Sequence, residues 1–361
     1  MSKKLTFQIN HRYQTMRTGV VTVNGRQLVT PAVVQTGSAL TTLTPAELKH
    51  SGVQAIKQDA MDYWRSADDL GDLHALLGWS GILVTASGAD QAYHWAKPRG
   101  RKKDGVSFHD PDNNQLRFYT PQDALAEQQR LGADISQGFA RDDDYFAPVD
   151  DLNAAATQTA AWLTTQPALA GDLAPLVGGG LLRVRKASLA AIPESVAGYS
   201  IMGVTPDVPT AEQVRLVTEV VAMLDTAKLR YLPTTGDLHQ LIAMLFSGVD
   251  LIDSDLAGRE AAMGNALVGT QRLHIDRGRF ARDNQPLAPE CGCPVCQAKV
   301  SRAAIHHLLV TGQPVGERYL LMHNLFTIDQ LVAQIREMIT TGQVTAEYVN
   351  LLNTVTSSGF L

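Results

Sequence analysis

Eight short apolar segments, separated by stretches with helical patterning, predict an α/β protein folded as a (β/α)8 TIM barrel. The eight segments are residues 32–36, 53–56, 81–85, 133–137, 175–177, 199–204, 228–232 and 249–253. Parallel strands need long crossover connections, which the intervening helical segments supply. Eight such repeats are the number that closes a barrel.

A doubly wound open sheet is the rival architecture. It would place a G-x-G-x-x-G phosphate loop after the first strand, and the sequence has none there. The run Gly178-Gly179-Gly180 is too short for such a loop and is interpreted as a tight turn at a strand end. We therefore expect a single domain spanning residues 1–361.

Further elements follow from local signals. Residues 5–8 and 19–30 predict an N-terminal β-hairpin, and residues 328–339 predict an apolar helix. Thr44, followed by Pro45 and Glu47, predicts a helix start with a capping box. Related starts are expected at Thr120 and Thr210, and Asn153 is expected to cap a helix over 154–165.

Composition restricts the class of protein. The chain of 361 residues is 45% hydrophobic and 19% charged, as in ordinary globular proteins. It contains no apolar run near the ~20 residues that a membrane span requires, and its first residues lack the apolar core of a signal peptide. We expect a cytoplasmic protein.

The net charge of −5 argues against a protein whose whole surface binds nucleic acid, yet two local basic clusters are present. The first cluster consists of Lys97, Arg99, Arg101, Lys102 and Lys103. The second lies between residues 272 and 302 and consists of Arg272, Arg277, Arg279, Arg282, Lys299 and Arg302. Either cluster is suited to phosphate contact or is simply a solvated loop balanced by acidic neighbours.

The only three cysteines, Cys291, Cys293 and Cys296, lie within six residues. Their odd number argues against disulfides, and thiolates at this spacing can bind one tetrahedral zinc ion with a histidine as fourth ligand. His306, His307 and His323 are the nearby candidates. A site with four protein ligands is structural, so we expect a structural Zn²⁺ in a subdomain at about residues 265–330; three incidental cysteines are the alternative.

These residues together resemble the tRNA-guanine transglycosylases, which exchange bases in queuosine and archaeosine tRNA modification. The matching stretches are residues 17–23, 30–33, 78–85, 131–134, 248–253, 291–308 and 323–325. The family's zinc pattern, C-x-C-x-x-C with a later histidine-asparagine pair, implies that His323 is the fourth ligand. The spacing is one residue longer here.

The resemblance also implies a catalytic nucleophile. In the family, a carboxylate attacks C1′ of the wobble guanosine, as in a retaining glycosidase, and a 7-substituted deazaguanine then replaces guanine. The stretch G-V-D-L-I-D-S-D-L-A-G-R puts Asp253 in the nucleophile's position and Arg259 in that of an RNA-contacting arginine. Asp253 would also lie at the carboxyl end of the eighth strand, where barrel active sites form.

The family's other motifs are altered. The motif T-D-S-G-G-F-Q matches residues 85–91, with Ala86 in place of the acid/base aspartate. Ala140 replaces a base-recognising aspartate, Gly178 a glutamine and Met202 a glycine. The matched motifs imply that the base is contacted by Ser87, Gln91, Gly203 and Val204.

Because an alanine cannot transfer a proton, the standard reaction requires a carboxylate elsewhere. The candidates are Asp90, considered first, and Asp59, Asp142, Asp143 and Asp144. The loss of polar side chains also predicts a wider, more apolar pocket.

Two interpretations follow. The protein is an enzyme that keeps Asp253 and acts on an altered substrate, or it is a non-catalytic paralogue that binds RNA or serves as an accessory subunit. The expected partners are tRNA, a deazaguanine-type base, and a second copy or a paralogue in a dimer.

Overall fold

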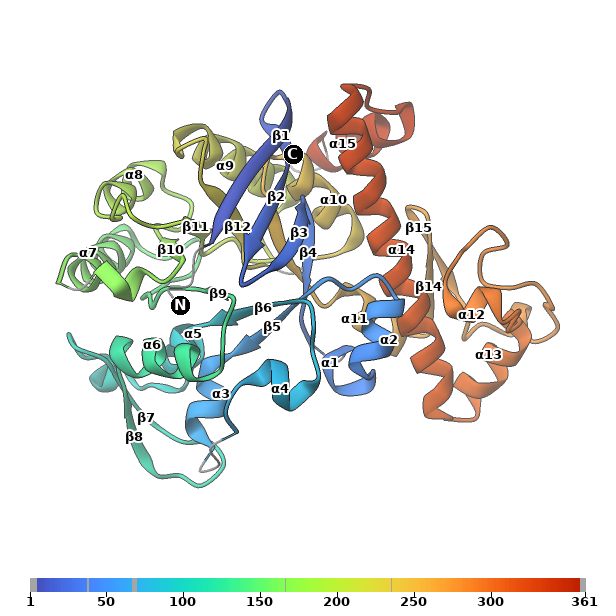
Figure 1. The fold of residues 1–361 in the computed structure, drawn as a ribbon, viewed down its shortest axis with the longest axis horizontal. Coiled ribbons are helices and arrows are strands. Elements are labelled where there is room, and N and C mark those ends of the chain that lie inside the picture. Colours follow the sequence, from blue (N-terminus) through green and yellow to red (C-terminus); the bar gives the residue numbers. More distant parts are fainter. Residues whose placement is uncertain (1–4, 38, 67–69, 166, 235, 358–361) are drawn as a thin grey trace.

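The computed structural model describes residues 5–37, 39–66, 70–165, 167–234 and 236–357, and it has the predicted (β/α)8 barrel (Figure 1). Each of the eight predicted segments contains or overlaps one parallel strand. The strands are β4 (Ala32–Gln35), β5 (Ala55–Asp59), β6 (Ile82–Ala86), β9 (Ile135–Ser136), β10 (Leu173–Leu176), β11 (Gly198–Ile201), β12 (Leu229–Leu232) and β13 (Leu251–Ser254).

The strand order closes the barrel. The sheet runs β10-β11-β12-β13-β4-β5-β6-β9, so that the eighth strand, β13, pairs with the first, β4. The remaining gap between β9 and β10 is spanned by a parallel bridge between Gln137 and Leu173. Alternate strand residues such as Val34, Val84 and Tyr231 fill the interior.

A three-stranded antiparallel sheet covers the amino end of the barrel. It consists of β1 (Thr6–Tyr13), β2 (Met16–Val23) and β3 (Arg26–Thr30), and its side chains continue the barrel core. The predicted hairpin is therefore extended by a third strand, because Asn24 and Gly25 have positive φ and form a turn within the segment predicted as continuous. This sheet covers the amino end, whereas the carboxyl end of the barrel borders a cavity.

The helices surround the barrel (Figure 1). They are α1 (Ala39–Thr42), α2 (Pro45–His50), α3 (Ala60–Arg65), α4 (Leu73–Leu77), α5 (Ala89–Trp95), α6 (Pro121–Arg130), α7 (Val149–Thr165), α8 (Leu182–Ala190), α9 (Thr210–Met223), α10 (Leu238–Phe246), α11 (Leu256–Ala262), α14 (Pro314–Thr341) and α15 (Ala346–Ser357). Short 3-10 turns are η1 (Pro98–Gly100), η2 (Pro167–Ala170) and η3 (Gly278–Phe280).

The predicted helix starts are partly confirmed. Thr44 and Thr120 each form the expected capping box, with Glu47 and Asp123 respectively. The other two caps are wrong: α9 begins at Thr210 itself after Pro209, and α7 begins four residues before Asn153.

Two insertions extend the barrel. The hairpin of β7 (Val106–His109) and β8 (Leu116–Tyr119) follows α5. The second insertion follows α11 and contains β14 (Asn265–Val268), β15 (Gln271–His274), α12 (Pro294–Gln297) and α13 (Arg302–Val310). It packs along the 28-residue helix α14, which includes the predicted helix 328–339. No described helix is long and apolar enough to span a membrane.

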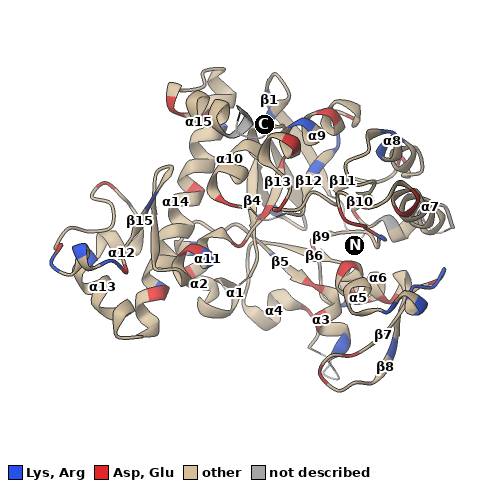
Figure 2. Ribbon diagram, turned by 180° about the vertical axis from the view of Figure 1, so that it is seen from behind, with Lys and Arg blue, Asp and Glu red and all other residues tan. Residues whose placement is uncertain are grey.

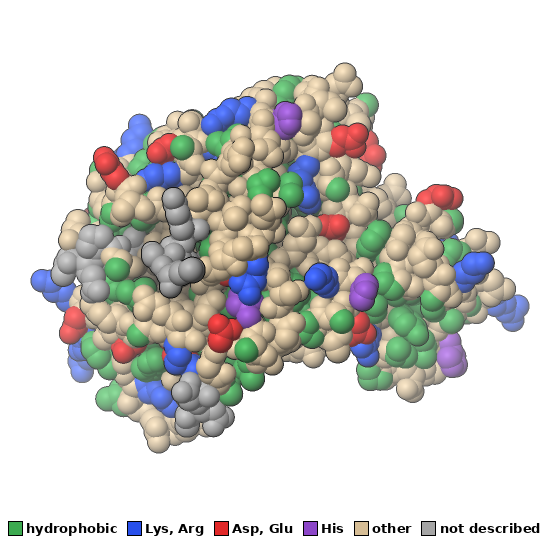
Figure 3. Space-filling view, in the orientation of Figure 1, with side chains coloured by type: hydrophobic (Ala, Val, Ile, Leu, Met, Phe, Trp, Pro, Cys, Tyr) green, Lys and Arg blue, Asp and Glu red, His purple; other side chains and the backbone are tan. Residues whose placement is uncertain are grey.

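The two basic clusters lie at opposite ends of the molecule, one beside α5 and β7 and the other around α12 and α13 (Figure 2). All five cations of the first cluster are exposed. In the second, Arg272 and Arg302 pair with Glu260 and Asp283. Arg272 is exposed as well as paired, and the other exposed cations there are Arg277, Arg279, Arg282 and Lys299. Hydrophobic side chains gather on the surface of the second insertion (Figure 3), where Val310 and Val315 are exposed.

Candidate functional site

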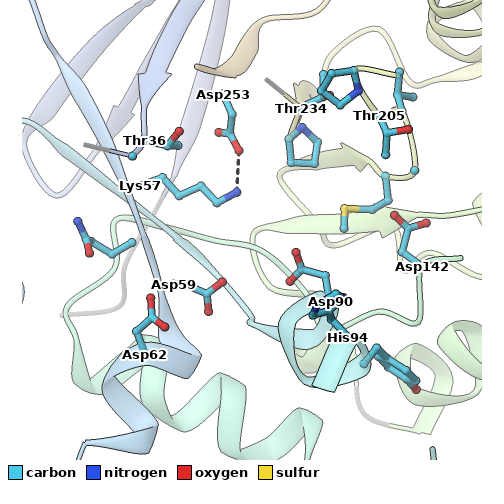
Figure 4. A pocket seen from close by; sticks show the side chains of 18 of the residues that line it. Thr36, Lys57, Asp59, Asp62, Asp90, His94, Asp142, Thr205, Thr234 and Asp253 are labelled. Carbon is cyan, nitrogen blue, oxygen red and sulfur yellow. Dashed lines mark hydrogen bonds and ion pairs between the residues drawn. The ribbon is translucent and has the colours of Figure 1, made fainter. Parts of the chain in front are cut away.

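A cavity of about 1240 Å³ opens at the carboxyl end of the barrel (Figure 4). It is bordered by the ends of β5, β12 and β13, the first turn of α5, and the loops after β9 and β11. Eight carboxylates line it: Asp59, Asp62, Asp90, Asp142, Asp143, Asp144, Asp151 and Asp253. The expectation of a more apolar pocket is therefore wrong, because it counted lost polar side chains and missed those that other loops contribute.

Asp253 lies in β13, and only 3% of the residue is exposed. Its Oδ2 accepts a hydrogen bond from Lys57 Nζ at 2.6 Å, and its Oδ1 accepts one from the Tyr231 hydroxyl. Burial raises the pKa of the Asp253 carboxyl, while the charge of Lys57 and both hydrogen bonds act against this rise. Lys57 and Tyr231 thus favour the ionised carboxylate that nucleophilic attack requires.

The sequence analysis did not identify Lys57 or Tyr231. Lys57 lies in β5, and its pKa is raised above that of an ordinary lysine by Asp253, Asp90 and Asp59, against the effect of burial. Tyr231 is fully buried in the barrel core. The one available signal was a lysine at the end of an apolar strand, where a charged side chain must point into a polar site.

Two further carboxyls in the cavity have pKa values near neutrality. Burial is the main cause for both: it raises the pKa of Asp59 to about 7, helped by the charge of Asp90. The pKa of Asp142 also rises to about 7, although Arg185 and the Gly203 amide lower it. Each is therefore able to hold or release a proton at neutral pH.

Three of the four substituted positions lie at strand ends but do not line the cavity, whereas Met202 does line it. Ala86 ends β6, Ala140 follows β9 and Gly178 follows β10. At Gly178, φ is +141°, and a Cβ would lie 2.9 Å from the Arg185 side chain. That buried arginine donates to the carbonyl groups of Leu176, Gly179 and Met202, so it occupies the space that a longer side chain at position 178 would need.

The residues predicted to contact a base are only partly brought together. Gly203 and Val204 line the cavity, whereas Ser87 is buried behind it and accepts through its backbone carbonyl from Tyr119. Gln91 lies on α5 and donates to Asp62 at 3.3 Å. Arg259 lies outside the cavity lining and donates to Asp255 at 2.7 Å and to the Gly236 carbonyl.

Cys291, Cys293, Cys296 and His323 form a compact group whose ligand atoms all lie within 4.8 Å of one another. His323 Nδ1 lies 3.4–3.6 Å from the three sulfur atoms. A tetrahedral zinc ion with bonds of ~2.3 Å to sulfur and ~2.05 Å to nitrogen separates these atoms by about 3.6 Å, so the donor set fits zinc.

The hydrogen bonds around this group explain why His323, and not another histidine, belongs to it. His323 Nε2 donates to the Leu267 carbonyl at 2.8 Å, which leaves Nδ1 free to bind a metal. His306 Nδ1 instead contacts the Ile275 carbonyl, and His307 is exposed; neither belongs to the group. Asn324, next to His323 on α14, accepts from the Leu267 amide and donates to the Ala257 and Asn265 carbonyls, which ties α14 to α11 and to β14 of the insertion.

The fold and the Cys3His group define a class of (β/α)8-barrel proteins that carry a metal-binding insertion after the last barrel strand. Comparison with known proteins identifies the family within this class. The family model for queuine tRNA-ribosyltransferase matches residues 13–356, and the chain belongs to that family.

The similarity to individual relatives covers nearly the whole chain. The queuine tRNA-ribosyltransferase of Gloeobacter violaceus is 30% identical over 98% of this chain and 97% of its own length. The enzymes of the same name from Synechococcus elongatus and Streptococcus thermophilus are each 29% identical, over 88% and 91% of this chain and 86% and 90% of theirs.

Proposed function

We propose that this protein is a tRNA-guanine transglycosylase-like pentosyltransferase of tRNA modification with altered or reduced activity. The proposal depends above all on Asp253, a carboxylate at the carboxyl end of β13 that borders the cavity and whose charge Lys57 and Tyr231 support. A carboxylate at the mouth of a barrel whose charged form is supported by a lysine and a tyrosine hydroxyl is suited to attack a ribose carbon.

In the proposed reaction, Asp253 attacks C1′ of the wobble guanosine and guanine leaves. The covalent aspartyl-ribose intermediate then accepts a deazaguanine-type base. Gly203 and Val204 line the space available to the base. We keep Ser87 and Gln91 as base contacts and Arg259, 45% exposed at its side chain, as an RNA contact.

The proposed activity is reduced because Ala86 and Ala140 carry no carboxylate. General acid–base catalysis is worth roughly 10²–10⁴-fold in rate. Because position 86 cannot supply it, either another residue transfers the proton or the reaction is slower. Asp90 remains the first candidate from the sequence, and the cavity offers others.

One observation favours the alternative, a non-catalytic accessory subunit. Both carboxylate oxygens of Asp253 already have hydrogen-bond partners, as expected of a carboxylate with a structural role. The non-catalytic protein would still bind RNA or a paralogous partner through its surface.

We also propose that the Cys3His group binds a structural zinc ion, and that the chain is one cytoplasmic domain of residues 1–361 with a zinc-binding subdomain at about 265–330. Exposed Val310 and Val315 on this subdomain suit a homodimer or a dimer with a paralogue.

Labelled guanine offered with unmodified tRNA tests the function. We expect incorporation that is slower than that of a family enzyme with its acid/base aspartate, and that disappears in Asp253→Asn. Incorporation at a full family rate would contradict the reduced activity. A complete lack of incorporation, combined with retained tRNA binding, would support the accessory subunit.

A further inference from the structure

We propose that Asp59 is the acid/base residue of this protein and takes over, from the neighbouring strand, the proton transfer that Ala86 cannot perform. This inference rests on the proposed function, because it assigns a role within that reaction.

The strand register gives the first argument. Asp59 ends β5, Ala86 ends β6, and the two are direct partners in the parallel pairing. Paired residues of neighbouring parallel strands point to the same face, and the strands lie roughly 4.8 Å apart. Moving a carboxylate from position 86 to position 59 therefore displaces it by about one strand spacing, at the same height in the barrel.

The turn after β6 gives the second argument. A Cβ on Gly88 would lie only 2.6 Å from Asp59 Oδ1, so the Asp59 carboxylate packs directly against the turn that begins at Ala86. Oδ1 accepts the Met61 amide at 2.9 Å, as the N-cap of α3. No hydrogen bond to Oδ2 is present among the described residues, and Asp59 lines the cavity.

The position of Asp59 on β5 also suits a role beside the nucleophile, Asp253. Lys57 and Asp59 are two residues apart on β5, hence on one face and separated by about 6.6 Å along the strand. Lys57 binds Asp253, so Asp59 lies one step closer to the cavity mouth than the residue that holds the nucleophile. Figure 4 shows Asp59 and the Lys57–Asp253 pair bordering the same space.

The charged surroundings of Asp59 support proton transfer at neutral pH. Burial and the nearby carboxylates Asp90 and Asp62 raise its pKa to about 7, whereas Lys57 and the Met61 amide lower it. The hydroxyl of the fully buried Tyr119 donates to the Ser87 carbonyl, and its pKa is raised by burial and by the charge of Asp59. A carboxyl in this environment is present in both protonation states near pH 7.

The other candidates fit less well. Asp90 is exposed on the first turn of α5, beyond the strand end, and it acts on Asp59 by raising its pKa. Asp142 follows β9 and lies beside Gly203 after β11, where the charge of Arg185 on α8 also acts on it, away from the β5–β6 edge. Asp143 forms an ion pair with Arg141 at 2.8 Å, and Asp144 is exposed.

The proposed step balances as follows. Asp253 forms a bond to C1′ as the C1′–N9 bond breaks, and the protonated Asp59 carboxyl gives its proton to the departing guanine. The incoming base then gives a proton to the Asp59 carboxylate as its nitrogen attacks C1′ and releases Asp253. Asp59 ends as it began, and no other reactant is needed.

The test is the rate of covalent adduct formation between the full-length protein and unmodified tRNA, followed from pH 5.5 to 9 on denaturing gels. Attack requires ionised Asp253 and protonated Asp59, so we expect a bell-shaped profile whose rate falls above about pH 7. Asp59→Asn keeps the helix cap and should lose this falling limb and about 10²-fold in rate at pH 6. Asp207→Asn, the same change at an exposed position outside the cavity lining, should retain the wild-type profile.

The outcomes separate the two levels of the proposal. Wild-type protein that forms no adduct at any pH would overturn the proposed function and the role of Asp59 with it. Adduct formation that keeps its rate and pH profile in Asp59→Asn would overturn the role of Asp59 alone. A falling limb lost in Asp142→Asn instead would assign the proton transfer to Asp142.

Discussion

Two carboxyls in one cavity, the buried Asp253 and the partly buried Asp59, acquire different properties from their neighbours. Asp253 has a lysine and a tyrosine hydroxyl as hydrogen-bond partners, which support its charged form. Asp59 has two aspartates nearby, which oppose its charged form. Pairs of carboxyls whose environments separate their pKa values are the usual basis for dividing nucleophile and acid roles.

Replacing Lys57 by methionine tests this division. Without the lysine charge, burial and Asp90 raise the pKa of Asp253 further, so the nucleophile becomes ionised only at higher pH. We expect the rising limb of adduct formation to shift to higher pH and the rate at pH 6 to fall by roughly tenfold or more. The protein should also lose roughly 3 kcal/mol of stability, because a buried charge loses its partner.

Lys57→Arg is the matched control because it keeps the positive charge. In this variant the rising limb of the pH profile of adduct formation should stay near its original pH. An unshifted limb in Lys57→Met, measured on protein whose thermal unfolding shows it to be folded, would contradict the electrostatic role of Lys57.

Residues that belong to a sequence motif were identified from the sequence. Residues whose position depends on the pairing between strands were not singled out. Asp253 followed from its motif and its strand end. Asp59 was one of four alternatives considered after Asp90, because the register that aligns it with Ala86 depends on hydrogen bonds between strands. Arg185 was not singled out, since a buried arginine is recognised only by its three carbonyl partners.

The Cys3His group, which is suited to bind a metal ion, draws its side chains from two separate elements. The three cysteines lie around α12, whereas His323 lies within α14 and is fully buried. A metal ion at this position would join the insertion to the long helix that also packs against α11. The stability of the insertion should therefore depend on metal more strongly than that of the barrel does.

Chelation should show this dependence. We expect one zinc per chain by metal analysis, and its removal should increase hydrogen exchange in residues 265–330 before exchange increases in the barrel strands. Cys293→Ser should reproduce this effect, whereas His307→Ala, a change at an exposed histidine outside the group, should not. Purified protein without zinc, or zinc retained at full occupancy in Cys293→Ser, would contradict the assignment.

Helices and turns were predicted where the signal is local. The boxes at Thr44 and Thr120 combine a cap, a proline and an acidic residue in four positions, and both are present. Asn153 does not cap α7, because the helix starts four residues earlier and residues on both sides of Asn153 are buried within it. The β7–β8 hairpin was missed because its strands are short and one, β8, is largely exposed.

Closure of the barrel leaves one end of the molecule available for binding. Acidic side chains line the cavity at this end, and basic side chains form two clusters on the surface. The cavity is lined by carboxylates, yet Arg101 of the first basic cluster also lines it. The second cluster lies at the other end of the molecule (Figure 2). A net charge of −5 therefore conceals two separate surfaces suited to phosphates, and a ligand as long as tRNA could contact both.

Reversing the charges of Arg277 and Arg279 tests whether the distant cluster takes part. Both side chains are exposed, so the variant R277E/R279E should fold normally and bind tRNA more weakly at low salt. If each arginine contacts one phosphate, the slope of log affinity against log salt should decrease by about 1.5, since each contact contributes roughly 0.7–0.9. The double variant R183E/K186E, which reverses two exposed charges on α8, is the matched control and should retain the wild-type slope. Equal slopes for all three proteins would exclude the metal-binding insertion from RNA contact and leave the cluster at residues 97–103 to bind tRNA alone.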